Sequence, residues 1–214
     1  MTFATVLPAV LFGFGTSLAL IVAIGAQNAY VLRVGLQAAT RAVVPVVVVC
    51  AVSDAVLISA GVAGIGALVE AAPRAVLVVQ LVGAGFLLVY GAFAATRAIR
   101  PTGALTVDVD GASPTAPARI VPAVLGALAF TWLNPHTYLD TVVFLGSVAN
   151  HQPPELRWWF AAGAITGSLV WFSALGFGAR LLRPLFAKPG AWRVLDGVIA
   201  VVMVALGVRL LTGI

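Results

Sequence analysis

Apolar residues run along this chain in six long stretches, separated by shorter segments that hold most of the charged residues. A helix needs about 20 apolar residues to cross the hydrocarbon core of a bilayer, and each stretch is at least that long. The stretches do not alternate in polarity, as membrane β-strands would. The pattern predicts an all-α integral membrane protein with six transmembrane helices over residues 5–32, 42–68, 73–95, 121–149, 156–181 and 193–212.

Residues 96–119 form a long polar segment that divides the chain into two halves. The segment is rich in proline, glycine and aspartate, which is typical of a linker rather than a helix. We expect a three-helix half over 1–95, a cytoplasmic linker over 96–119 and a second three-helix half over 120–214. Three spans per half place the halves in opposite orientations, which is the inverted-repeat plan of many secondary transporters.

The composition fits a chain embedded in a lipid bilayer. Hydrophobic residues make up 62% of the 214 residues and charged residues only 9%, whereas a soluble domain carries about 25% charged residues. The net charge of +5 would suggest nucleic-acid binding in a soluble protein. Because no basic cluster is interleaved with aromatic residues, nucleic acid is excluded as a partner.

The basic residues predict how the chain is oriented in the membrane. Nine of the twelve lie near the loops that follow the first, third and fifth spans, and three lie on the opposite side. Cytoplasmic loops of membrane proteins carry an excess of Lys and Arg. We therefore expect these three loops in the cytoplasm of a bacterial cell, a multi-pass chain in the inner membrane and both termini outside.

Two acidic residues lie inside apolar spans. Asp54 is near the middle of the second span, where a charge costs about 2.5–3.5 kcal/mol on insertion scales, and Asp140 is well inside the fourth. If both carboxylates face one cavity they repel each other unless a cation or a proton lies between them. Both are therefore candidates for holding a cationic substrate and for proton coupling. The alternative is a structural role, for Asp140 as a partner of Arg33 or His136.

Helix-breaking residues occur at matching places in the first and fourth spans. Such interrupted spans mark the binding site of many transporters, because freed N–H groups can hold a carboxylate and freed carbonyls an ammonium. The predicted binding residues are Gly25, Gln27, Asn28, Asn134, Pro135 and His136, together with Asp54 and Asp140. Interhelical hydrogen bonding is the alternative for the two asparagines, and His136 is either a hydrogen-bonding partner or a proton carrier.

Several of these motifs resemble one known family. The run Ala-Phe-Thr-Trp-Leu-Asn-Pro-His-Thr-Tyr-Leu-Asp-Thr over 129–141 closely resembles a segment of the lysine/arginine exporters, the LysE-type translocators. Gly-Ala-Gln-Asn-Ala-Tyr-Val-Leu over 25–32 resembles their Gly-Pro-Gln-Asn motif, and 52–54 resembles their second-span pattern. The resemblance covers nearly the whole chain apart from 96–119. At Ala26 the family has proline, so the neighbouring glycine and carboxamides must keep the first break open.

The resemblance implies export of L-lysine, L-arginine or close analogues from the cytoplasm, driven by the proton-motive force. It also implies a transporter and not an enzyme. The sequence holds no nucleotide-binding loop and no cluster of metal ligands, so no cofactor and no metal are expected. Export of neutral amino acids or of another small solute is the alternative on the same scaffold, and a homodimer stays open. A thiol-redox enzyme would need two cysteines, and only Cys50 is present.

Overall fold

A computed structural model of the chain describes residues 3–22, 25–37, 40–64, 73–99, 120–186 and 189–212, and every regular element in these ranges is a helix. The all-α prediction is therefore confirmed. The elements are α1 (Phe3–Ile21), α2 (Ala26–Gln37), α3 (Thr40–Val62), α5 (Pro73–Ile99), α6 (Ile120–Trp132), α7 (Pro135–Tyr138), the π-helix η1 (Leu139–Leu145), α8 (Gly146–Asn150), α9 (Arg157–Gly178), the 3₁₀ turn η2 (Ala179–Leu182), α10 (Arg183–Phe186) and α11 (Pro189–Thr212).

Several of these helices can cross a membrane. Within the described ranges, four are long and apolar enough, namely α3, α5, α9 with η2, and α11, and the bent pair α1–α2 makes a fifth. The apolar helix α6 has only 13 residues. The chain is thus a multi-pass membrane protein, and the full six-span inverted layout stays a prediction. Of the predicted linker, residues 96–99 continue α5 and the rest lies outside the described residues.

The first predicted break is a sharp bend. Helices α1 and α2 meet at 83°, with Gly25 in the break and Ala26 fully buried as the first residue of α2. The side-chain amide of Asn28 donates a hydrogen bond to the Ile21 carbonyl at 2.5 Å. That bond satisfies a carbonyl which the end of α1 leaves free, so the break is stable without the proline that the family has at position 26.

The second predicted break lies between α6 and α7. Asn134 is extended, and its side-chain oxygen accepts the N–H of His136 at 3.2 Å, which caps α7. Pro135 is the first residue of α7, where its missing N–H costs nothing. The Tyr138 hydroxyl donates to the Trp132 carbonyl at 2.8 Å, so this break too is bridged by side chains.

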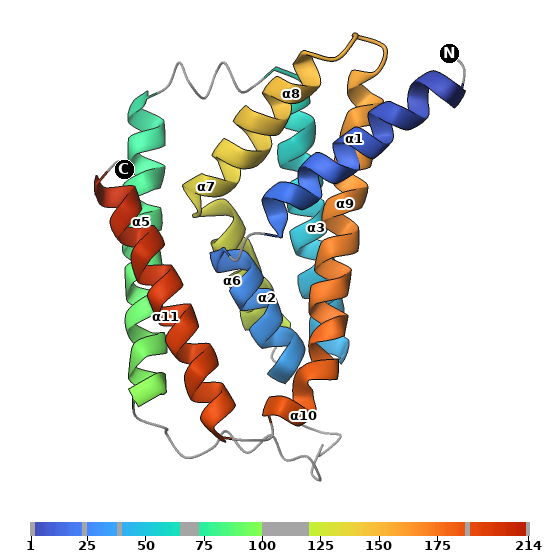
Figure 1. Cartoon of the computed structure of the whole chain (residues 1–214). Coiled ribbons are helices and arrows are strands. Elements are labelled where there is room, and N and C mark those ends of the chain that lie inside the picture. Colours follow the sequence, from blue (N-terminus) through green and yellow to red (C-terminus); the bar gives the residue numbers. More distant parts are fainter. Residues whose placement is uncertain are drawn as a thin grey trace.

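The two broken helices cross the middle of the molecule (Figure 1). From the upper end, α1 descends to mid-height and α2 continues downward, whereas α6 rises from the lower end and α7, η1 and α8 continue upward. Helices α5 and α11 pack together on one side, and α3 and α9 lie on the other, with α9 packed along α1. Both breaks therefore lie inside the bundle at a similar height.

Glycines allow the closest helix contacts. A Cβ at Gly13 of α1 would overlap the backbone carbonyl of Phe160 in α9, and a Cβ at Gly146 of α8 would lie 2.6 Å from the carbonyl oxygen of Gly61 in α3. Small residues of this kind let membrane helices approach backbone to backbone. They fix α1 on α9, and α8 on α3, around the breaks.

We predict that Gly13→Ala destabilises the protein and that Gly15→Ala in the same helix does not. The added methyl group at position 13 must push α1 away from α9, which we expect to cost about 1–3 kcal/mol. At position 15 nothing lies within 4 Å of the new Cβ, and alanine favours the helix. Thermal unfolding of both variants in detergent checks this; equal melting temperatures for the two would contradict the close α1–α9 contact.

Candidate functional site

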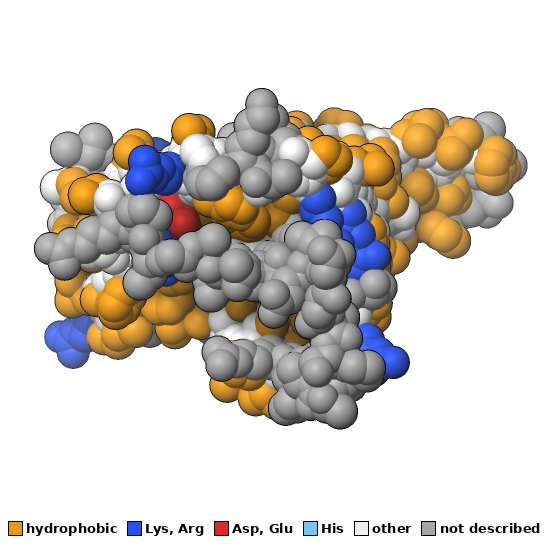
Figure 2. Space-filling view, turned by 90° about the horizontal axis from the view of Figure 1, so that it is seen from below, with side chains coloured by type: hydrophobic (Ala, Val, Ile, Leu, Met, Phe, Trp, Pro, Cys, Tyr) orange, Lys and Arg blue, Asp and Glu red, His pale blue; other side chains and the backbone are white. Residues whose placement is uncertain are grey.

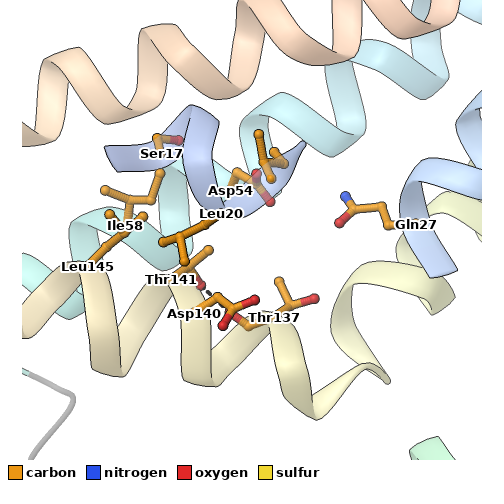
Figure 3. Close-up of a pocket in the computed structure, with 10 residues that line it drawn as sticks. Ser17, Leu20, Gln27, Asp54, Ile58, Thr137, Asp140, Thr141 and Leu145 are labelled. Atoms are coloured by element: carbon orange, nitrogen blue, oxygen red, sulfur yellow. Dashed lines mark hydrogen bonds between the residues drawn. The ribbon is translucent and has the colours of Figure 1, made fainter. Parts of the chain in front are cut away.

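A cavity of about 70 Å³ lies where the end of α1, the start of α2, the middle of α3 and the α7–η1 segment meet (Figure 3). Its polar wall consists of Ser17, Gln27, Asp54, Thr137, Asp140 and Thr141. The structure thus brings both predicted aspartates and the predicted glutamine into one place. A cavity of this size holds a few waters but is much smaller than an ordinary small-molecule site. The helices must therefore separate before a whole amino acid can enter.

Asp54 is the more deeply buried of the two aspartates of this cavity, with 3% of its surface exposed. One carboxylate oxygen, Oδ2, accepts a hydrogen bond from the Ser168 hydroxyl of α9 at 2.6 Å. The other, Oδ1, is buried and has no hydrogen-bonding partner among the described residues. A buried oxygen without a partner is costly, so this carboxylate can accept a proton, a water molecule or a cation.

Asp140 forms the opposite wall, and it lies in the π-helix η1. Among the described residues, His136, one turn earlier, and Arg209 of α11 interact with it electrostatically. In the same segment the Thr141 hydroxyl donates to the Thr137 carbonyl at 2.5 Å. Single wide turns of this type are frequent at functional sites, and here the wide turn contributes Asp140 and Thr141 to the cavity lining, next to Thr137 of α7.

Gln27 and Asn28 are adjacent in sequence, but only the side chain of Gln27 lines the cavity. The Gln27 side chain lines the cavity and donates to the Thr131 hydroxyl of α6 at 2.9 Å, which joins the two broken helices. Asn28 lies outside the cavity lining: besides its bond to α1, its oxygen accepts the indole N–H of Trp171 at 3.1 Å. The contacts of Asn28 are thus those of interhelical hydrogen bonding.

The residues of the second break lie elsewhere. Asn134 and His136 line another cavity, of about 220 Å³, between α5, α7 and α11, and the Asn134 oxygen already caps α7. Gly25 and Pro135 line neither cavity. Of the eight predicted residues, the structure therefore gathers Gln27, Asp54 and Asp140 at one cavity and two others at the second.

Two features escaped the sequence reasoning. The hydroxyls of Ser17, Thr137, Thr141 and Ser168 look, in sequence, like ordinary polar residues of membrane helices. The second feature is a buried charge cluster near the lower end: Asp196 of α11 is paired with Arg33 of α2 and, at 3.3 Å, with Arg97 of α5. An acidic residue inside the last apolar stretch was the available signal. The ion-pair partner of Arg33 is thus Asp196 and not Asp140.

Comparisons with known proteins agree with one another. The family model for LysE type translocators matches residues 18–213. The lysine exporter LysE of Corynebacterium diphtheriae is 36% identical over 93% of this chain and 96% of its own length. The arginine exporter protein ArgO of Yersinia enterocolitica is 38% identical over 89% and 90%. A Mycobacterium tuberculosis protein named for amino-acid transport is 46% identical over 89% and 90%. No solved structure matches.

We predict that Asp54→Asn leaves the protein at least as stable as the parent, whereas Ser168→Ala destabilises it. The amide oxygen of asparagine can still accept from Ser168, and a buried charge with an unpaired oxygen is removed. Losing the serine hydroxyl strips the carboxylate of its one described partner, which we expect to cost about 1–3 kcal/mol. Thermal unfolding in detergent measures the stability of both variants. A larger drop in melting temperature for Asp54→Asn than for Ser168→Ala would show that the carboxylate has a structural role.

Proposed function

Because this chain belongs to the LysE-type translocator family, which consists of membrane transporters and not enzymes, we propose that it exports the basic amino acids L-lysine and L-arginine from the cytoplasm. The relatives named for lysine and arginine export support this substrate class. The observation that carries the proposal is Asp54, whose unpartnered buried oxygen belongs to a cavity that it shares with Asp140.

The cavity suits the cationic end of such a substrate. Two carboxylates facing one small space repel each other, and an ammonium or guanidinium between them removes that repulsion. A neutral amino acid carries no side-chain charge to do so, which is why the basic substrates are preferred. The carboxylate end of the substrate meets donors at the two breaks, near Gly25–Asn28 at the start of α2 and near Asn134–His136.

Transport follows alternating access with proton exchange. Moving one positive charge outward against an inside-negative potential costs about 2.3 kcal/mol per 100 mV, and proton entry offsets that cost. A proton that arrives from outside on Asp54 or Asp140 neutralises the carboxylate and releases the cation. In the proposed cycle the two three-helix halves rock about the broken helices, so that the closed cavity opens to each side in turn.

The cytoplasmic side is the lower end of Figure 1, and the membrane is the bacterial inner membrane. The elements α2, α3, α5, η2, α10 and α11 have basic residues near this end, and Figure 2 shows several Lys and Arg side chains on it. The described members of this set are Arg33, Arg41, Arg97, Arg180, Arg183 and Arg193. Arg100, Arg119 and Lys188 lie outside the described residues. The start of α1 and the end of α11 point the other way, toward the outside.

We predict that cells preloaded with labelled lysine or arginine release it faster when they make this protein, and that a protonophore abolishes the difference. Asp54→Asn and Asp140→Asn should each lower the protein-dependent efflux about tenfold or more, since each removes a negative charge from the cavity. His151→Gln, in an exposed turn, is the control and should export normally. Full export by both aspartate variants would remove the carboxylates from the mechanism; no efflux of either amino acid would move the proposal to neutral amino acids.

The orientation has its own test, because the sequence holds a single cysteine. In a Cys50→Ala background, we expect His151→Cys to react with a membrane-impermeant maleimide in intact cells. Arg41→Cys should react only after the membrane is permeabilised. Both positions are exposed: Arg41 lies at the start of α3, and His151 lies in the turn after α8. The reverse labelling pattern would invert the proposed topology.

A further inference from the structure

The second cavity differs from the first in the charge of its wall. Its polar side chains are Gln80 of α5, Asn134 and His136 at the second break, and Arg209 of α11, and three leucines complete it. Its described lining contains a guanidinium, an imidazole and two carboxamides, but no carboxylate. At about 220 Å³ it is also the larger of the two. The chemistry of this wall suits an anion, whereas that of the first cavity suits a cation.

Arg209 is the group that sets this preference. A guanidinium presents paired N–H donors that match the two oxygens of a carboxylate. An arginine near a helix end can simply extend toward the membrane surface, but Arg209 is among the residues that line this cavity. The side chain is therefore directed at the α7–η1 segment, where it lines the cavity together with His136.

The α7–η1 segment contributes to both cavities. Asp140 lines the first cavity and His136, four residues earlier, lines the second. Residues four apart are separated by about 6 Å along a helix axis, and an extended lysine or arginine places its cation slightly farther than that from its carboxylate. A single substrate can thus reach both walls once the helices between them have separated.

We propose that the second cavity is the subsite for the substrate's α-carboxylate and that Arg209 is the residue which makes the transporter require that carboxylate. The proposal rests on export of basic amino acids as the function. Before substrate arrives, Arg209 interacts with Asp140. The incoming carboxylate takes over Arg209, and Asp140 becomes available to the substrate's cation together with Asp54. Both ends of the amino acid are then recognised in one exchange of partners.

The test compares arginine with agmatine, which is arginine without its carboxylate. Purified protein in phosphatidylcholine liposomes should transport labelled arginine about tenfold or more faster than agmatine, as expected for a charge-assisted contact. In Arg209→Gln, the preference for arginine over agmatine should disappear, because arginine transport falls while agmatine transport is retained or rises once Asp140 no longer interacts with Arg209. Retained agmatine transport also shows that the variant is folded. Arg209→Lys should keep part of the preference. Arg193→Gln, near the other end of α11, should keep all of it.

The possible failures are distinguishable. If the parent protein transports neither arginine nor lysine, the proposed function fails and this inference fails with it. If the parent transports arginine and Arg209→Gln still prefers it over agmatine, only the subsite is overturned. If a lipid phosphate occupies the second cavity, Arg209→Gln should change the arginine and agmatine rates equally, and only in liposomes that contain phosphatidylglycerol. That result also overturns the carboxylate subsite. If Arg209→Gln transports neither substrate, the Gln80→Leu variant provides the test. A reduced preference of Gln80→Leu for arginine over agmatine supports the subsite, and an unchanged preference overturns it.

Discussion

Inside a bilayer the backbone has no water to bond with, so a helix can stop there only where other groups of the protein satisfy its ends. Each break of this chain meets that requirement with side chains. The Asn28 side chain donates a hydrogen bond to the Ile21 carbonyl at the first break, and the Asn134 side chain accepts one from the His136 N–H at the second. Residues at or next to these breaks line both polar cavities, Ile21 and Gln27 the first, and Asn134 and His136 the second.

The buried charges of the molecule fall into two kinds. Asp196 has two arginine partners, from α2 and α5, and joins three elements near the proposed cytoplasmic end. Asp54 has one neutral donor and a bare oxygen beside a cavity. Removing a partner from a paired buried charge is strongly destabilising, whereas a charge that lacks a full set of partners is expensive to keep and is a candidate for function. The difference in partners, rather than burial itself, separates the structural acid Asp196 from Asp54, for which we propose a functional role.

Much of this arrangement follows from sequence because the membrane restricts what apolar stretches can do. The long runs became helices, and glycine and proline located both breaks. The energetic cost of a carboxylate in lipid singled out Asp54 and Asp140, which share a cavity. Sequence did not separate Gln27 from Asn28, since only the packing of α6 and α9 decides which carboxamide faces the cavity. Nor could it pair Arg33 with Asp196, because that contact depends on how α2 meets α11.

The wide turn of η1 has a consequence for the cavity that lies beside it. A π-helical turn contains about one residue more than an α-helical turn, and each residue of a helix turns the chain by about 100°. If the stretch Leu139–Leu145 tightened into an α-helix, residues on one side of it would rotate by about that angle relative to the other side. In the register that the wide turn provides, Asp140 lines the cavity. A shift of that register, which turns the segment on one side of η1 relative to the other, would be enough to withdraw a carboxylate from the cavity.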